Sequence, residues 1–170
     1  ASGTDVQKSG CYDIYSNGNG SLMRIALLLF YINNKPILER FEITKQVSAI
    51  THGHIRSVMA CFYYLEFARY LSLGKDKFEI YKKLQDEITS FFNSLSINQS
   101  EISLFHRLLK QNIDQLKEEE INSSGYVIDT LEASIWCLLT TNDYESAILK
   151  AVNLGRDTDT TGAVTGGLAG

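Results

Sequence analysis

Apolar residues recur along this 170-residue chain at the three- and four-residue spacing of amphipathic helices, and no stretch alternates as a half-buried strand does. This spacing predicts helices over residues 37–50, 55–73, 76–95 and 126–141. Residues 21–31 are apolar almost all round, which predicts a fully buried helix that is too short to cross a membrane. The sequence therefore predicts a compact, multi-helix all-α fold.

Capping and turn residues mark the predicted helix ends. Gly74 and Gly155 each have the position of the left-handed residue that follows a helix. Asn98 with Glu101, and Asn142 with Glu145, have the spacing of capping pairs at helix starts. Aromatic residues at helical spacing are expected in the core: Phe62, Tyr63, Tyr64, Phe67 and Tyr70.

Composition narrows the class of protein. With 44% hydrophobic residues, the chain is long enough for one core, so residues 1–170 are expected to form a single domain. The formal net charge is −4 without a basic cluster, which argues against nucleic-acid or membrane partners. Cys11, Cys61 and Cys137 form no paired motif, and residues 1–10 lack signal-peptide features. A soluble, cytoplasmic protein is expected.

The stretch D-T-D-T-T-G at residues 157–162 carries the clearest candidate chemistry. Asp157 and Asp159 can converge on one cation, and neighbouring hydroxyls add hard oxygen ligands of the kind that magnesium, manganese and calcium prefer. The alternative is a simple N-cap for a helix that starts here. A calcium loop of the EF-hand type is excluded, because its twelfth position falls on Leu168, where a glutamate is required. A D-x-D-x-T phosphatase motif would be expected after a strand, not after a helix.

Two glycine-rich segments add to this picture. Gly162, Gly166 and Gly170 stand four residues apart, so on a helix they form one smooth face that lets another backbone approach closely. Residues 15–24, Y-S-N-G-N-G-S-L-M-R, lead from glycine and asparagine directly into a helix. Backbone N–H groups in such a loop can point at a phosphate, although the same residues also form flexible turns and caps.

The chain resembles the ADP-ribosylglycohydrolase family, also called the dinitrogenase reductase-activating glycohydrolase family, in four segments. They are S-N-G-N-G-S-L-M-R-I-A (16–26), S-A-I-T-H-G-H (48–54), G-Y-V-I-D-T-L-E-A-S-I-W (125–136) and A-V-N-L-G-R-D-T-D-T-T-G-A (151–163). Order and approximate spacing agree across nearly the whole chain. The resemblance implies an all-α fold, a binuclear centre of two Mg²⁺ or Mn²⁺ ions, and removal of ADP-ribose from a modified side chain or small acceptor.

The resemblance also implies roles for individual residues. Asp157, Asp159 and Thr160 would be metal ligands, with Asp159 bridging the ions, and both aspartates would act in catalysis through the bound metals. Asn19 would be the best polar contact to ADP-ribose. The implied substrate-binding residues are Ser16, Gly18, Asn19, Gly20, Ser21, His52 and Tyr126. The residues alone favour a structural pair as the interpretation of His52 and His54.

The chain matches only part of the family pattern. Family members carry an earlier half, with a Thr-Asp-Asp helix start that supplies further metal ligands, and these 170 residues resemble only the C-terminal portion. A fragment, a processed product or one part of a split enzyme is expected, with the N-terminal part as a separate partner chain. Leu27 replaces a common proline and Arg156 a usual glycine. The predicted function is an ADP-ribosyl-acceptor hydrolase for arginine, serine or small-molecule acceptors; the alternative is a non-catalytic ADP-ribose-binding or structural descendant.

Overall fold

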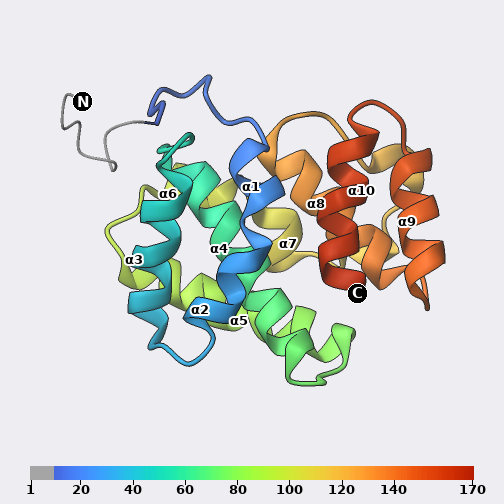
Figure 1. The fold of residues 1–170 in the computed structure, drawn as a ribbon, viewed down its shortest axis with the longest axis horizontal. Helices are drawn as coiled ribbons and strands as arrows, with labels where there is room; N and C mark the ends of the chain where they lie inside the picture. Colours follow the sequence, from blue (N-terminus) through green and yellow to red (C-terminus); the bar gives the residue numbers. More distant parts are fainter. Residues whose placement is uncertain (1–9) are drawn as a thin grey trace.

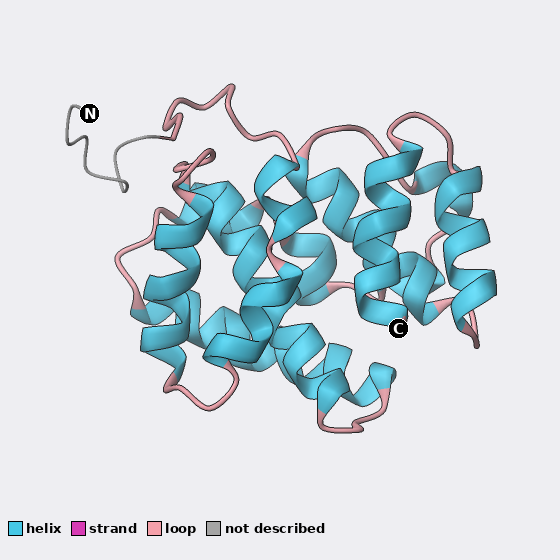
Figure 2. Cartoon of the chain, in the orientation of Figure 1, coloured by secondary structure: helices cyan, strands magenta, loops and turns pink. Residues whose placement is uncertain are grey.

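The computed structural model of the protein describes residues 10–170 (Figure 1, Figure 2). In this part of the chain, helices joined by loops make up the fold, and no β-strand is present. The α-helices are α1 (Gly20–Arg24), α2 (Leu29–Ile32), α3 (Ile37–Ser48), α4 (Ile55–Ser72), α5 (Lys77–Ser94), α6 (Gln99–Ser103), α7 (His106–Lys110), α8 (Val127–Leu139), α9 (Tyr144–Asn153) and α10 (Thr158–Ala169). Short 3-10 turns are η2 (Ala26–Leu28), η3 (Ile113–Gln115) and η4 (Glu118–Glu120). The all-α prediction is confirmed. Residues 1–9, which entered the signal-peptide argument, lie outside the described part.

Helices α4 and α8 form the centre of the core. Almost every side chain of both helices is buried, because α3, α5 and α10 pack around α4 while α9 and α10 pack on α8. The predicted core aromatics of α4 are all buried, and Phe62 meets Phe41 of α3 edge to face, with ring centroids 5.2 Å apart. Among the described helices, none has the length and apolar character needed to cross a bilayer.

The predicted helix boundaries hold where the signal is local, with two exceptions. Asn98 caps α6 by accepting from the Ser100 N–H at 3.0 Å, but Glu101 does not complete the capping pair because its carboxylate binds Arg56. The prediction for Asn142 is wrong. The carboxylate of Asp143, one residue later, accepts from the Ser146 N–H at 2.9 Å and caps α9.

The chain reverses through residues in the left-handed region after α4 and after α9. Gly74 has φ 70° and Gly155 has φ 79°, as expected for residues that end helices. Arg156 follows with φ 58°, a conformation that strains a side chain with a Cβ. This backbone conformation explains why glycine is usual at this position in the family.

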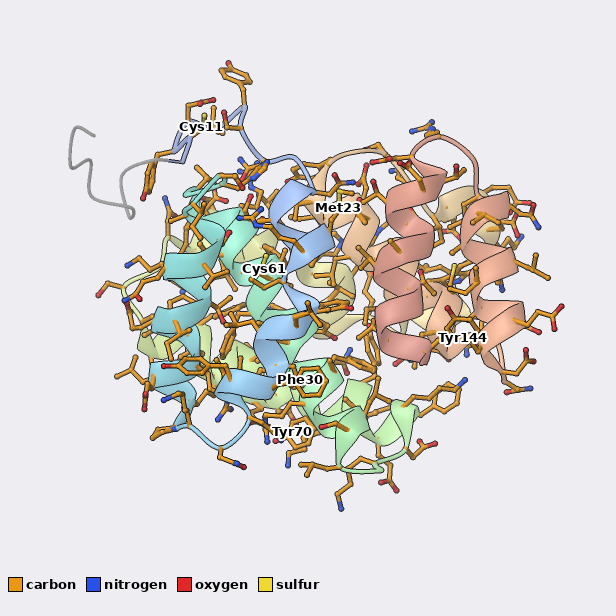
Figure 3. The ribbon with its side chains drawn as sticks, viewed as in Figure 1. Cys11, Met23, Phe30, Cys61, Tyr70 and Tyr144 are labelled. Atoms are coloured by element: carbon orange, nitrogen blue, oxygen red, sulfur yellow. The ribbon has the colours of Figure 1, made fainter. Side chains whose placement is uncertain are left out.

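The prediction that residues 21–31 form a fully buried helix is wrong. The segment is divided into α1, η2 and α2, and only its inner side, which includes Leu22 and Ile25, packs against α4. Its outer side exposes Met23, Leu27 and Phe30 by 47%, 77% and 82%; Figure 3 labels Met23 and Phe30 on this segment. We call Met23, Leu27 and Phe30 the apolar ridge.

The glycine face of α10 packs against α9, as the spacing of its glycines predicts. A Cβ built on Gly162 would lie 3.0 Å from Val152 Cγ1, and one on Gly166 would lie 3.1 Å from Ile148 Cδ1. A larger residue at either position requires the facing side chain of α9 to move. The close approach of α9 and α10 holds the N-terminus of α10 beside α8 and α1 (Figure 1).

Candidate functional site

Three segments that are distant in sequence meet where α1, α8 and α10 begin. Asn19 N–H donates to the Gly125 carbonyl at 3.0 Å, which joins the loop before α1 to the segment before α8. Asp157 N–H donates to the Ser123 carbonyl at 3.1 Å, which joins the start of α10 to the same segment. These backbone bonds bring the G-N-G loop and the D-T-D-T-T-G stretch together, as their adjacent helix starts show in Figure 1.

Asp157 occupies the N-cap position of α10, yet its side chain does not cap the helix. Instead, Asp157 Oδ2 accepts a hydrogen bond from Asn19 Nδ2 at 2.6 Å. This bond is the largest cause of the lowered pKa of Asp157; Thr160 and Asp159 lower it further, and partial burial opposes them. A simple capping role therefore does not explain the Asp157 carboxylate, which is held ionised toward the loop.

Asp159 and Thr160 lie in the first turn of α10 beside Asp157. Asp159 is exposed, while Thr160 is buried with its hydroxyl 3.6 Å from the Met23 sulfur. Two carboxylates and a hydroxyl form a hard-oxygen donor set of the kind that suits Mg²⁺ or Mn²⁺. Residues 10–170 contain no group of three or more His, Cys, Asp or Glu side chains arranged to hold a metal. This donor set fits part of a metal site.

Asn19 is buried and uses its amide nitrogen within the protein. Nδ2 donates to Thr130 Oγ1 at 2.8 Å as well as to Asp157. The side chain that the sequence suggests as the best ADP-ribose contact thus holds a predicted metal ligand. Sequence reasoning missed Thr130, and it missed Gly125, where a Cβ would lie 3.3 Å from Asp157 Oδ2. Both lie within a segment that matches the family, but no local pattern distinguishes them.

His52 packs against the glycines of the loop. A Cβ on Gly20 would lie 2.9 Å from His52 Cε1, and one on Gly18 would lie 3.4 Å from His52 Nε2. Burial and then the nearby Arg24 guanidinium lower the pKa of His52, so its imidazole is neutral at pH 7. The two glycines make room for this ring. His54 has a separate role, since its Nδ1 accepts from the Arg56 N–H at 3.2 Å and caps α4.

The two serines that flank the loop do not face a common point. Ser16 Oγ donates to the Asp13 carboxylate at 2.5 Å, near the surface. Ser21 is fully buried, and its hydroxyl accepts from the Cys61 thiol at 3.5 Å. The structure therefore does not bring the Ser21 hydroxyl to the loop surface, although the backbone N–H groups of Gly18, Gly20 and Ser21 have no hydrogen-bond partner within the described residues.

Tyr126 stands at the N-cap position of α8, next to Gly18 across an isolated bridge. Its half-buried ring lies 5.8 Å from the guanidinium carbon of Arg56. Arg56 is itself held by two bonds of 2.8 Å to the Glu101 carboxylate. Burial raises the pKa of Tyr126, so the phenol stays protonated at neutral pH. An aromatic residue therefore lies next to Gly18 of the loop.

Comparison with known proteins gives a consistent result. A family model described as ADP-ribosylglycohydrolase matches residues 1–170. The chain is 33% identical over 162 residues to ADP-ribosylarginine hydrolase Tri1 of Pseudomonas putida (strain GB-1), which covers 95% of this chain and 40% of that protein. It is 28% identical over 155 residues to the ADP-ribosyl-dinitrogen reductase glycohydrolase of Rhodospirillum rubrum, covering 90% of this chain and 45% of that protein.

A structural comparison agrees. A solved ADP-ribosylglycohydrolase-related protein complex superposes with a TM-score of 0.73 at 27% identity, covering 93% of this chain and 50% of the other. The chain thus spans half or less of the length of these relatives. The family model spans residues 1–170, which include the loop, the Ser123–Tyr126 segment and the start of α10. The chain belongs to the ADP-ribosylglycohydrolase family.

Proposed function

We propose that the protein acts in hydrolysis of the glycosidic bond that links ADP-ribose to a modified acceptor. The observation that carries this proposal is the Asp157 carboxylate, which stands at the start of α10 but turns away from capping and toward the G-N-G loop. A carboxylate in this position is oriented to bind a ligand and does not cap the helix. Two relatives carry the name ADP-ribosylarginine hydrolase, which favours arginine as the acceptor.

The proposed metal site consists of Asp157, Asp159 and Thr160, which would hold Mg²⁺ or Mn²⁺ in a two-ion centre. When bound, such ions polarise substrate oxygens and lower the pKa of water, which is the chemistry that hydrolysis at an anomeric carbon needs. Asp157 and Asp159 would contribute the negative charge needed to hold cations beside the positive end of α10. Thr160 would contribute a neutral oxygen.

The proposed substrate-binding residues surround the loop. The free backbone N–H groups of Gly18, Gly20 and Ser21 would donate to the diphosphate. Neutral His52 would keep the loop in shape and remain available to the phosphates or the distal ribose. Tyr126 offers the aromatic face on which an adenosine would lie.

We further propose that residues outside this chain complete the site, in a longer protein or in a partner chain. The described residues hold only part of a metal ligand set. The matches cover only 40% and 45% of the two curated relatives, so each relative has further residues that this chain lacks. A non-catalytic ADP-ribose binder is the second candidate. It is supported by the loop N–H groups and the Tyr126 ring, which lie within this chain and would bind ADP-ribose without a metal.

The test combines metal binding with turnover in a protein that includes the family's earlier half. Asp157→Asn and Asp159→Asn should each weaken Mn²⁺ binding at least tenfold and abolish ADP-ribose release from ADP-ribosylated arginine, because each removes a charged ligand. Thr160→Val should have a smaller effect. Mn²⁺ affinity is measured by calorimetry and release by chromatography of free ADP-ribose.

The matched control is Asp143→Asn, which changes an aspartate that does cap a helix and stands away from the loop. Because asparagine caps about as well as aspartate, this variant should keep both stability and metal affinity. Wild-type metal affinity and turnover in both site variants would refute Asp157 and Asp159 as the metal ligands of the proposed hydrolase. ADP-ribose binding without any release by the wild-type protein would favour the non-catalytic binder.

A further inference from the structure

Asn19 has an orientation that the hydrogen bonds decide. Its side chain is buried, with 8% of the residue exposed, and Nδ2 lies 2.6 Å from Asp157 Oδ2. An ionised carboxylate only accepts hydrogen bonds, so the amide nitrogen and not the amide oxygen must face Asp157. A hydrogen bond from a buried amide to a carboxylate is charge-assisted and short, which makes it one of the stronger kinds.

Thr130 fixes the same amide from a second side. Its hydroxyl is fully buried in the first turn of α8, and its one hydrogen points to two carbonyl oxygens, those of Ser124 at 3.0 Å and Tyr126 at 3.3 Å. The oxygen is then free to accept the second hydrogen of Asn19 Nδ2, at 2.8 Å. Both amide hydrogens of Asn19 are therefore used, and neither is left for a ligand.

The main chain holds the two partners in register. Asn19 N–H is bonded to Gly125 and Asp157 N–H to Ser123, so both residues are attached to one short segment. Gly125 allows the carboxylate to approach this segment closely, because a Cβ there would lie 3.3 Å from Oδ2. The position of the amide relative to the carboxylate is thus set by three elements at once.

We propose that Asn19 is a positioning residue for the metal site, and that it joins the G-N-G loop mechanically to Asp157. By donating to Oδ2 it orients the carboxylate and leaves Oδ1 for a cation. This inference rests on the proposed metal role of Asp157. In this role the Asn19 amide nitrogen does not contact ADP-ribose directly. A movement of the loop would change the position of the Asp157 carboxylate.

The first experiment measures Mn²⁺ affinity by calorimetry, without nucleotide, on the same longer protein that includes the family's earlier half. Asn19→Ala should weaken Mn²⁺ binding about 10- to 100-fold, the usual effect of removing a partner that orients a ligand. Thr130→Val should weaken it less, and Thr130→Ser should restore it, because serine keeps the accepting hydroxyl. The matched control is Asn112→Ala, at an exposed asparagine far from the loop, which should leave the affinity unchanged. Unchanged Mn²⁺ affinity together with weaker ADP-ribose binding in Asn19→Ala would overturn the inference.

The second experiment separates this inference from the proposed function. In the NMR spectrum of ¹⁵N-labelled protein, Asp157→Asn should shift the side-chain NH₂ resonances of Asn19 far more than Asp159→Asn does. Equal or absent shifts would overturn the inference even if the wild-type protein binds metal. If the wild-type protein binds no Mn²⁺ but the Asn19 resonances do shift, the proposed metal site is refuted while the hold of Asn19 on Asp157 is upheld.

Discussion

Helix α10 and the α1–α2 segment both carry small or apolar residues, yet they are covered to very different extents. The glycines of α10 let α9 approach to within side-chain contact, and the helix is enclosed by α8, α9 and α4. The α1–α2 segment is more hydrophobic, but its apolar ridge of Met23, Leu27 and Phe30 faces solvent. The difference shows that hydrophobicity alone does not bury a helix; a neighbour within the chain must be able to reach it.

The largest effect is expected from a substitution that prevents the close approach of α9 and α10. Gly166→Val should destabilise the fold by about 2–3 kcal/mol, because the new methyl groups overlap Ile148, which lies 3.1 Å from the Cβ position. Gly166→Ala should cost less, since Ile148 needs to move only a few tenths of an ångström. Urea unfolding followed by circular dichroism measures both. Equal stability of Gly166→Val and wild type would show that the glycine face is not under packing constraint.

A buried glutamate on α8, which packs against α10, should make the stability of the protein depend on pH. Burial raises the pKa of Glu132 on α8 to about 7 from its usual 4.5, although Arg107, 3.4 Å away, opposes the shift. The folded state therefore holds a proton that the unfolded state has lost between pH 4.5 and 7, so the stability that this group contributes is complete below pH 4.5 and is lost as pH rises to 7.

Glu132→Gln removes this titration. The difference in unfolding free energy between wild type and variant should change by about 2–3 kcal/mol from pH 4.5 to pH 7.5, with the wild type losing relative stability as pH rises. Denaturant unfolding at a series of pH values measures it. The control is Glu119→Gln, at an exposed glutamate of η4. Parallel pH curves for wild type and Glu132→Gln would contradict the raised pKa.

The turn that leads into α10 offers a smaller gain. Arg156 has φ 58°, and glycine adopts this conformation without the steric cost of a Cβ. Arg156→Gly should stabilise the protein by about 1 kcal/mol, partly offset by the greater freedom of glycine in the unfolded chain. Thermal unfolding measures the change. A loss of stability would indicate that the arginine side chain contributes more than its backbone strain removes.

The smallest effect is expected on the apolar ridge. Leu27→Ser and Phe30→Ser should each change the unfolding free energy by less than about 0.5 kcal/mol, because both side chains are already exposed to water. Leu22→Ala, on the inner side of the same segment, is the matched contrast and should cost about 3 kcal/mol. Large losses in the two serine variants would mean that the ridge is covered in solution, which size-exclusion chromatography would then detect as association.

The helices, most of their ends and the segments that form the site were predictable from the residues alone. Helical spacing is a local property, so the long helices α3, α4, α5 and α8 were predictable from their own residues. Gly74 and Gly155 were predictable as helix ends, since a left-handed residue after a helix favours glycine wherever the helix lies. Asp157 and Asn19 were singled out because their motifs are compact in sequence.

The contacts of these side chains depend on how the helices pack. The bonds from Asn19 to Thr130 and to Asp157 join residues that are 111 and 138 positions apart, so no local pattern could indicate them. For the same reason Thr130 and Gly125 went unnoticed, and the outer side of residues 21–31 was predicted to be buried. Whether a carboxylate caps its own helix or turns to a distant amide, and whether an apolar side chain meets a neighbour or water, depends on packing between elements, which the order of residues along one element does not contain.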